Sequence, residues 1–97
     1  MDEPPPNPPP VNVPIDGVLD LHTFKPSEIG DLVSSYLDEC RQRGILEVRI
    51  IHGKGIGNLR RTVHALLKRR TDVIRFATAS ANFGGTGATI VVLKKIG

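Results

Sequence analysis

Six residues in the middle of the chain, His52 to Gly57, constrain the fold more than any other stretch. They read His-Gly-Lys-Gly-Ile-Gly, with a glycine at every second position. An apolar run at residues 46–51 precedes them, and a segment with helical spacing begins at Asn58. This order predicts a strand, a glycine-rich turn and a helix. Such a turn presents bare backbone N–H groups and the positive end of a helix to an anion.

The anion that this turn suits best is a phosphate. Because Lys54 lies between two glycines and a basic helix follows, we expect the phosphate to belong to a nucleic acid, either DNA or RNA. The glycine spacing fits neither a P-loop nor a dinucleotide-binding pattern, so no nucleotide cofactor is expected. The basic helix carries a stripe at four-residue spacing, for which a solvated helix face is the alternative. The predicted phosphate contacts are Lys54, Gly53, Gly55, Gly57, Arg60, Arg61, His64 and Lys68, of which Arg60, His64 and Lys68 form the stripe.

Charge is divided unevenly along the chain. Residues 1–40 carry eight acidic residues and one basic residue, whereas residues 41–97 carry twelve basic and two acidic residues. A division of this kind favours a basic face with a polyanionic partner. The alternative is that the two halves interleave in space, in which case their fields cancel.

The apolar pattern predicts six elements in the order β-α-β-α-β-β. After Pro26, apolar residues recur with the period of a helix that buries one stripe. The predicted elements are a strand at 18–22, a helix that starts near Pro26 and is closed by Gly44, a strand at 46–51, a helix capped by Asn58, and strands at 73–80 and 88–95. Residues 82–87 form a flexible connection with the character of a hairpin. This pattern implies a two-layer α/β sandwich, in which a four-stranded mixed sheet packs with two helices, and it leaves the strand order open.

Residues 1–14 differ in composition from the rest of the chain. They hold seven of the eight prolines and little to bury, so we expect a disordered or polyproline-II tail, followed by one domain at 15–97. No apolar run reaches the length of a membrane span and no secretory leader is present, so we expect a cytoplasmic protein and no membrane partner. Because Cys40 is the single cysteine, we expect neither a disulfide nor a cysteine-based metal site. We expect a monomer.

Three polar side chains are predicted at one edge of the sheet. Asp20 and His22 lie two residues apart at the end of the first predicted strand, on one face, and His52 ends the second. A β-α-β crossover makes these strands parallel, so both ends lie at the same edge. Asp20, His22 and His52 are therefore the candidate catalytic residues, beside Lys54 and the glycine turn. The alternative is structural: the aspartate bonds to local backbone, and the first histidine is a satisfied edge residue.

Three blocks of sequence together resemble the Smr (small MutS-related) domain. They are residues 19–22 (Leu-Asp-Leu-His), residues 51–55 (Ile-His-Gly-Lys-Gly) with the following Leu59 and Arg60, and residues 84–89 (Gly-Gly-Thr-Gly-Ala-Thr) leading into 92–94. The resemblance covers residues 16–95. It implies a compact α/β fold similar to the C-terminal domain of translation initiation factor three.

The resemblance also implies a function and further site residues. Members of this family bind nucleic acid, and several nick DNA or cleave RNA. The third block adds Gly84, Gly85 and Gly87 to the nucleic-acid site. In the family the first block usually ends in glycine after the histidine, whereas this chain has Thr23 there, a difference that bears on cleavage more than on binding. Such domains are often fused to an ATPase body or to helical repeats, so this chain resembles a stand-alone form.

Two functions compete on this basis. In the first, the domain is an endonuclease, with His22 and His52 as base and acid near neutral pH because imidazole titrates at about 6.5. Asp20 then orients a histidine or helps to hold Mg²⁺. Because a metal site usually needs more oxygen ligands than one carboxylate, we expect a mechanism that depends little on a metal ion. In the second, the domain recognises branched or single-stranded nucleic acid without cutting it. A third possibility is an adaptor that acts through the proline-rich tail.

Overall fold

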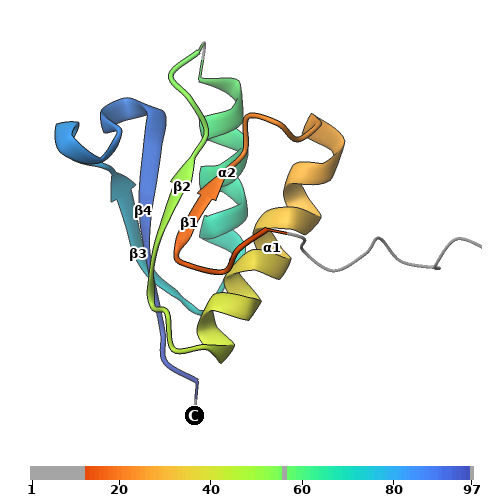
Figure 1. The fold of residues 1–97 in the computed structure, drawn as a ribbon, viewed down its shortest axis with the longest axis vertical. Coiled ribbons are helices and arrows are strands. Elements are labelled where there is room, and N and C mark those ends of the chain that lie inside the picture. The colour runs from red at the N-terminus through yellow and green to blue at the C-terminus, as the bar shows by residue number, and fades with distance from the viewer. Residues whose placement is uncertain (1–12, 56, 97) are drawn as a thin grey trace, which may run out of the picture.

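A computed structural model of the chain describes residues 13–55 and 57–96 (Figure 1). It contains six principal elements in the predicted order β-α-β-α-β-β. They are β1 (Val18–Asp20), α1 (Pro26–Gln42), β2 (Glu47–Ile51), α2 (Asn58–Arg69), β3 (Val73–Thr78) and β4 (Ala88–Leu93). The predicted α/β sandwich of two helices and a four-stranded mixed sheet is confirmed.

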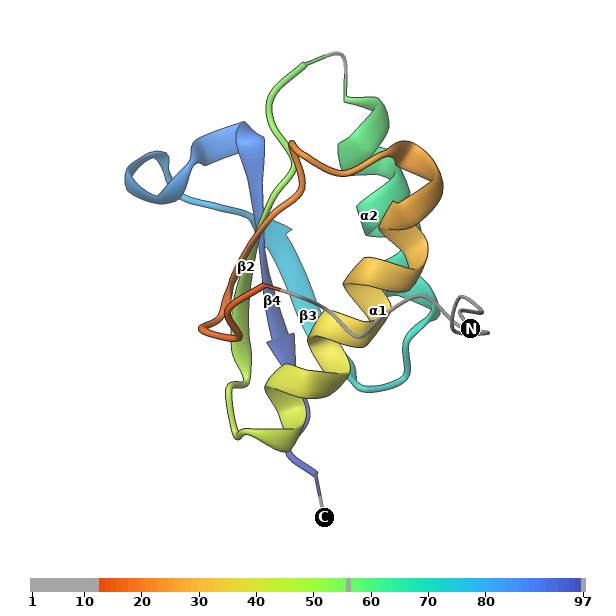
Figure 2. The same ribbon diagram turned by 45° about the vertical axis from the view of Figure 1, so that its right-hand side comes forward.

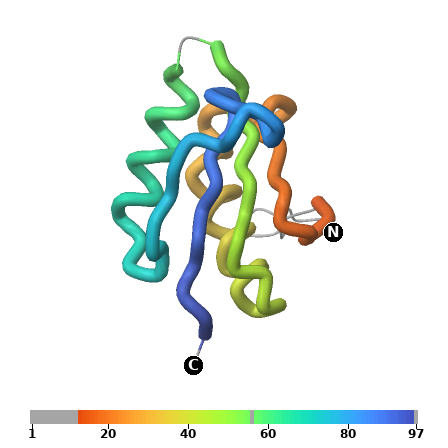
Figure 3. Tube along the Cα trace, turned by 90° about the vertical axis from the view of Figure 1, so that its left-hand side faces the viewer, coloured from red at the N-terminus to blue at the C-terminus, as the bar shows by residue number. Residues whose placement is uncertain are grey.

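The sheet has the order β1-β2-β4-β3, which the sequence left open. β1 and β2 are parallel, whereas β4 pairs antiparallel with both β2 and β3. Both helices cover the same face of the sheet, as Figure 2 shows. Neither α1 nor α2 covers the other face, which is turned toward the viewer in Figure 3. We call this second face the open face of the sheet.

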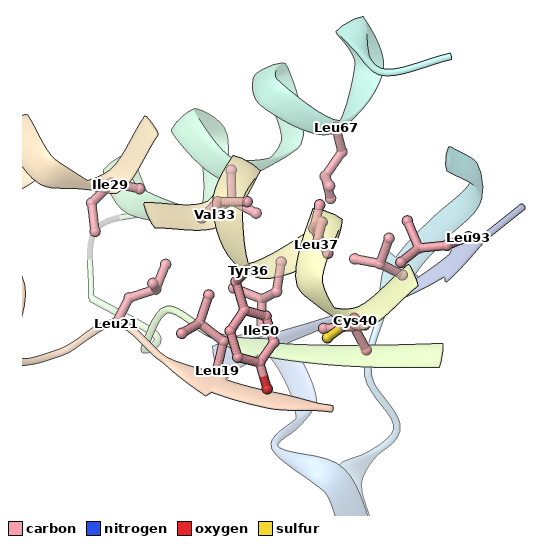
Figure 4. Packing of buried hydrophobic residues seen from close by; sticks show 13 residues of the cluster. Leu19, Leu21, Ile29, Val33, Tyr36, Leu37, Cys40, Ile50, Leu67 and Leu93 are labelled. Atoms are coloured by element: carbon pink, nitrogen blue, oxygen red, sulfur yellow. The ribbon is translucent and has the colours of Figure 1, made fainter. Parts of the chain in front are cut away.

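The core fills the space between the sheet and the two helices. Leu19, Ile50 and Val91 face it from the three strands β1, β2 and β4, and the inward stripes of both helices complete it (Figure 4). Tyr36 of α1 is fully buried. Its hydroxyl accepts a hydrogen bond from the Gly17 N–H at 3.0 Å and lies 3.1 Å from the Val18 carbonyl, to which it donates. This contact fastens α1 to the start of β1.

The helix ends agree with the predictions at two of the three positions predicted. α1 starts at Pro26, and Gly44 follows its end with a φ of +76°, as expected for a residue that closes a helix. The prediction that Asn58 caps α2 was wrong. Gly57 occupies the N-cap position with a φ of +86°, and Asn58 is the first helical residue. The Asn58 side chain accepts a hydrogen bond from Arg61 instead.

One ion pair, Arg70–Asp38, joins the two differently charged halves of the chain and belongs to a small network around Arg70 and Asp72. Arg70 contacts Asp72 at 2.7 Å and Asp38 of α1 at 2.6 Å, and Arg41 of α1 contacts Asp72 at 3.2 Å. The alternative of interleaved charges therefore holds for this region, and Arg70 is committed to structure rather than to a basic face.

The ends of the domain bear on two further predictions. The predicted tail at 1–14 lies outside the described residues up to position 12. Val13 and Ile15 pack against the core, so the packed chain extends two residues before the predicted start of the domain. Neither of the two described helices is long and apolar enough to cross a membrane.

Candidate nucleic-acid site at one edge of the sheet

Three segments that are distant in the sequence meet where β1 and β2 end. The Leu21 N–H donates to the Ile51 carbonyl at 2.9 Å, which joins the end of β1 to that of β2. The Gly87 carbonyl accepts from both the His52 and Gly53 N–H groups, at 3.0 and 2.9 Å. The segment before β4 is therefore tied to the glycine turn. The backbones of all three sequence blocks converge at this edge, which is the upper end of the sheet in Figure 1.

Asp20 and His22 form a hydrogen-bonded pair on the surface. One carboxylate oxygen, Oδ1, accepts from the His22 N–H at 3.0 Å and lies 2.7 Å from His22 Nδ1. The His22 side chain is 73% exposed. The hydrogen bond from the His22 ring, helped by the one from its backbone, lowers the pKa of Asp20 below its usual value. A carboxylate therefore orients an exposed imidazole through Nδ1, so that Nε2 lies on the far side of the ring.

His52 lies in the other direction, toward the helices. In the β1–β2 register Leu19 pairs with Ile50 on the core face, and Asp20 pairs with Ile51 on the open face. His52 follows Ile51 and therefore lies on the core side, where it is only 6% exposed. The structure thus brings the backbones of the two histidine motifs together but places their rings on opposite sides of the sheet edge.

Both ring nitrogens of His52 have internal partners. Nδ1 lies 3.0 Å from the Gly53 carbonyl, which can only accept, so Nδ1 carries a proton. Nε2 lies 2.8 Å from the Thr89 hydroxyl, and His64 Nε2 lies 2.8 Å from the same hydroxyl. In the neutral state Thr89 therefore donates to His52 and accepts from His64. We call these three residues the histidine–threonine chain.

His64 is half-buried, and its ring lies against the sheet rather than on a fully solvated stripe. Its ring packs edge-on against Phe76 of β3, with centroids 4.9 Å apart. Burial lowers the pKa of His64, and the charges of His52, Arg60 and Lys68 act in the same direction. Of the predicted stripe, Lys68 is exposed and Arg60 half-buried, whereas the His64 ring lies against the sheet.

The turn after β2 has a backbone that only glycine adopts easily. Gly53 has a φ of +83° and Gly55 one of +25°. Gly87 packs so closely against this turn that a Cβ atom there would lie 3.3 Å from Cγ of Lys54. Lys54 itself is exposed. The turn therefore presents an ammonium group to solvent and is held in place by the segment before β4.

The predicted flexible connection before β4 is more ordered than expected. It contains two short 3-10 helices, Ala81–Phe83 and Gly85–Gly87. The Phe83 and Gly85 N–H groups both donate to the Ser80 carbonyl at 2.9 Å. At Gly84, with a φ of +110°, a Cβ atom would lie 2.9 Å from that of Ala88. These bonds and this close approach fix the loop beside the site.

Sequence reasoning missed Thr89 as a member of the site. It is fully buried at the second position of an otherwise apolar strand. A hydroxyl at an inward strand position needs a partner, and this signal could have been used. Among residues 13–55 and 57–96, no group of three or more histidine, cysteine, aspartate or glutamate side chains is placed to hold a metal ion.

The fold and the three converging motifs define a Smr domain, and the family model of the Smr domain matches residues 19–94. The chain belongs to this family. In solved structures it is similar to the Smr domain of Thermus thermophilus MutS2, with a TM-score of 0.76 and 35% identity over 81% of this chain and 99% of that one. It is also similar to YdaL, a stand-alone small MutS-related protein of Escherichia coli, with a TM-score of 0.75 and 33% identity over 81% of this chain and 65% of that one.

Among curated proteins the chain is similar to larger enzymes. It is 38% identical over 80 residues to endonuclease MutS2 of Clostridium tetani, and 39% identical over 77 residues to endonuclease MutS2 of Solidesulfovibrio magneticus. These matches cover 82% and 79% of this chain. The chain spans only 10% of the length of each relative.

Proposed function

We propose that this domain binds DNA or RNA at the edge where its three motifs meet and cleaves a phosphodiester bond there. The observation that carries the proposal is the pair formed by Asp20 and His22. A carboxylate that holds Nδ1 of an exposed imidazole at 2.7 Å leaves Nε2 directed to solvent for proton transfer. The name of the MutS2 relatives, endonuclease, supports the same reaction class.

The chemistry divides among the residues as follows. His22 Nε2 takes the proton of the attacking hydroxyl as a new P–O bond forms, and Asp20 stabilises the imidazolium that results. The leaving oxygen takes up a proton as the old P–O bond breaks. Lys54 and the N–H groups of the glycine turn hold the non-bridging oxygens of the phosphate. The exposed helical residues Arg61 and Lys68 contact further phosphates.

His52 takes a positioning role in this proposal. Its Nδ1–H donates to the Gly53 carbonyl, and its backbone N–H is bound to Gly87. With both ring nitrogens engaged, it shapes the turn that carries Lys54. The proton for the leaving group then comes from water or from His22.

The second candidate function is recognition without cleavage. It is favoured by the same geometry of His52, because one exposed histidine remains where the sequence suggested two. Thr23, exposed and adjacent to His22, stands where the family pattern usually has glycine. A side chain there narrows the approach of a phosphate to the imidazole.

One experiment separates the two functions. Supercoiled plasmid, a branched DNA and a structured RNA are each incubated with the domain in Mg²⁺ or in EDTA, and cleavage and gel mobility are measured on the same samples. We expect cutting by the wild type and none by His22→Ala, with binding kept by both. Asp20→Asn should lower the rate by weakening the orientation of His22, and the EDTA arm decides whether Asp20 also acts through a metal. Binding without cutting by the wild type would establish the recognition module, and Thr23→Gly then tests whether the threonine is the cause.

A further inference from the structure

A hollow on the open face of the sheet lies outside the three motifs. Its volume is about 500 Å³, and residues of β1, β2, β4 and the loop that precedes β4 line it. In Figure 3 this loop crosses in front of the upper ends of the strands. The residues that line the hollow are Asp16, Gly17, Val18, Glu47, Arg49, Ser80, Phe83 and Ile90.

An aromatic ring and a guanidinium group meet in this hollow. Phe83 is 56% exposed, which is unusual for a phenylalanine in a domain with a well-formed core. The guanidinium carbon of Arg49 lies 5.8 Å from the centre of its ring. The hydrogen bonds from Phe83 and Gly85 to Ser80 hold the ring in a fixed loop. Aromatic rings and guanidinium planes are the two protein groups on which nucleobases stack.

The charges around the hollow select a base rather than a phosphate. Asp16 and Glu47 are among its lining residues, and their carboxylates would repel a phosphate. Carboxylates accept hydrogen bonds from the exocyclic amino groups of cytosine and adenine, whereas uracil and thymine have a carbonyl oxygen at that position. A hollow with a ring, a guanidinium and two carboxylates therefore fits an amino-bearing base.

The hollow adjoins the candidate catalytic pair on the same face. Val18 lines the hollow, and Asp20 follows two residues along β1 with the same orientation. This spacing corresponds to about 7 Å along the strand. A base in the hollow therefore places the phosphate of a neighbouring nucleotide at Asp20 and His22. A base that is paired and stacked in a duplex cannot enter, so the strand that binds here is single-stranded or has an extruded base.

We propose that this hollow binds one unpaired, amino-bearing base of the strand whose phosphate lies at Asp20 and His22. The inference rests on the proposed function for the phosphate and adds a specificity for single strands and for cytosine or adenine over uracil or thymine. The loop before β4 then has two roles, because Gly87 fastens the glycine turn while Phe83 stacks on the base.

The test uses the absence of tryptophan from the chain. Phe83→Trp places a single fluorescent indole in the hollow, and titration with short oligo-C and oligo-U strands measures its quenching by a stacked base. We expect quenching and wild-type affinity for this variant, and a loss of about tenfold in single-strand affinity for Phe83→Ala, measured by fluorescence anisotropy. Ile74→Ala is the matched control, since Ile74 is 53% exposed on β3 and does not line the hollow. It should bind as the wild type does.

The base preference is tested by a ratio within each protein. We expect the wild type to bind oligo-C about three- to tenfold more tightly than oligo-U, and Glu47→Gln to reduce that ratio toward one. Far-UV circular dichroism of each variant checks that it is folded. Unchanged single-strand affinity in Phe83→Ala, or no quenching of the indole when the oligonucleotide is bound, would overturn the inference.

The outcomes also separate this inference from the proposed function. If the wild type cuts and Phe83→Ala binds normally, the proposal that the hollow binds a base is wrong, and the proposed cleavage at Asp20 and His22 stands. If the indole is quenched and no substrate is cut, the proposal that the hollow binds a base is supported, and the proposed cleavage is wrong. His22→Ala should abolish cutting while keeping the quenching. No binding of any nucleic acid would overturn both proposals.

Discussion

The histidine–threonine chain makes a sharp prediction about stability. Thr89→Val replaces a fully buried hydroxyl by a methyl group of nearly the same size. It removes the hydrogen bonds to His52 and to His64, both 2.8 Å long. We expect the variant to be less stable than the wild type, and Thr89→Ser to be affected less.

The magnitude follows from what the substitution leaves unpaired. His52 is only 6% exposed, so its Nε2 has no access to water, and an unsatisfied buried group costs about 1–3 kcal/mol. His64 is half-buried and can turn to water, which adds less. The extra apolar methyl offsets part of the loss. The expected loss in the free energy of unfolding is about 2 kcal/mol. Thr89→Ser keeps both hydrogen bonds and loses one buried methyl, at about 1 kcal/mol.

Urea unfolding followed by far-UV circular dichroism at pH 8 measures both variants. A loss of about 2 kcal/mol lowers the urea midpoint by about 1–2 M for a domain of this size. If hydrogen bonding governs the site, Thr89→Val destabilises more than Thr89→Ser; if only apolar packing matters, the order reverses. Long-range ¹H–¹⁵N NMR of the histidine rings provides a second readout, with the proton on Nδ1 of His52 and on Nε2 of His64. If Thr89→Val is as stable as the wild type, the hydrogen bonds of the histidine–threonine chain do not stabilise the fold.

Three further predictions concern stability. Because the pKa of His64 is lowered on folding, the unfolded state binds more protons than the native state as the pH drops. The free energy of unfolding should therefore fall as the pH drops through about 6.5. In His64→Gln this pH dependence should diminish, as measured by urea midpoints from pH 8 to pH 5. Asp72→Asn leaves the charge of Arg70 without its less exposed carboxylate partner and should cost about 2 kcal/mol at pH 7. The difference from wild type should shrink below pH 3.8, since the Arg70 hydrogen bond lowers the pKa of Asp72. Gly53→Ala should destabilise by about 1 kcal/mol, because its φ is +83°, whereas Gly30→Ala inside α1, where a Cβ meets no atom within 4 Å, should stabilise by up to about 1 kcal/mol. A Tm that rises for Gly53→Ala or falls for Gly30→Ala in thermal unfolding would contradict the backbone argument.

Local patterns were sufficient to predict the order of the elements and the edge at which the motifs meet. The helical periodicity after Pro26 and the polar ends of two parallel strands are properties of short segments, and they led to the correct crossover. The orientation of His52 was also readable. Glu47 and Arg49 alternate with Val48 and Ile50, and this period of two places His52 on the apolar side. The expectation that both strand ends meet at one edge of the sheet grouped His52 with His22 despite this alternation.

Other features depend on tertiary structure and could not be predicted. The hollow exists because β4 pairs between β2 and β3, which brings the loop with Phe83 over Arg49 of another strand. Nothing near either residue in the sequence specifies that meeting. The cap of α2 was missed for a different reason. Asparagine is a good capping residue, but the turn before it requires the left-handed backbone of Gly57, which takes the position one residue earlier.

The position of β4 has a consequence for the order in which the domain is built. β4 is the last strand in the sequence and yet lies inside the sheet, with β2 on one side and β3 on the other. Gly87 and Thr89, which hold the glycine turn and His52, arrive with it. A chain emerging from the ribosome therefore lacks the supports of its site until this strand has been inserted. The same strand therefore completes both the sheet and the support of the glycine turn, so a chain that still lacks β4 lacks both.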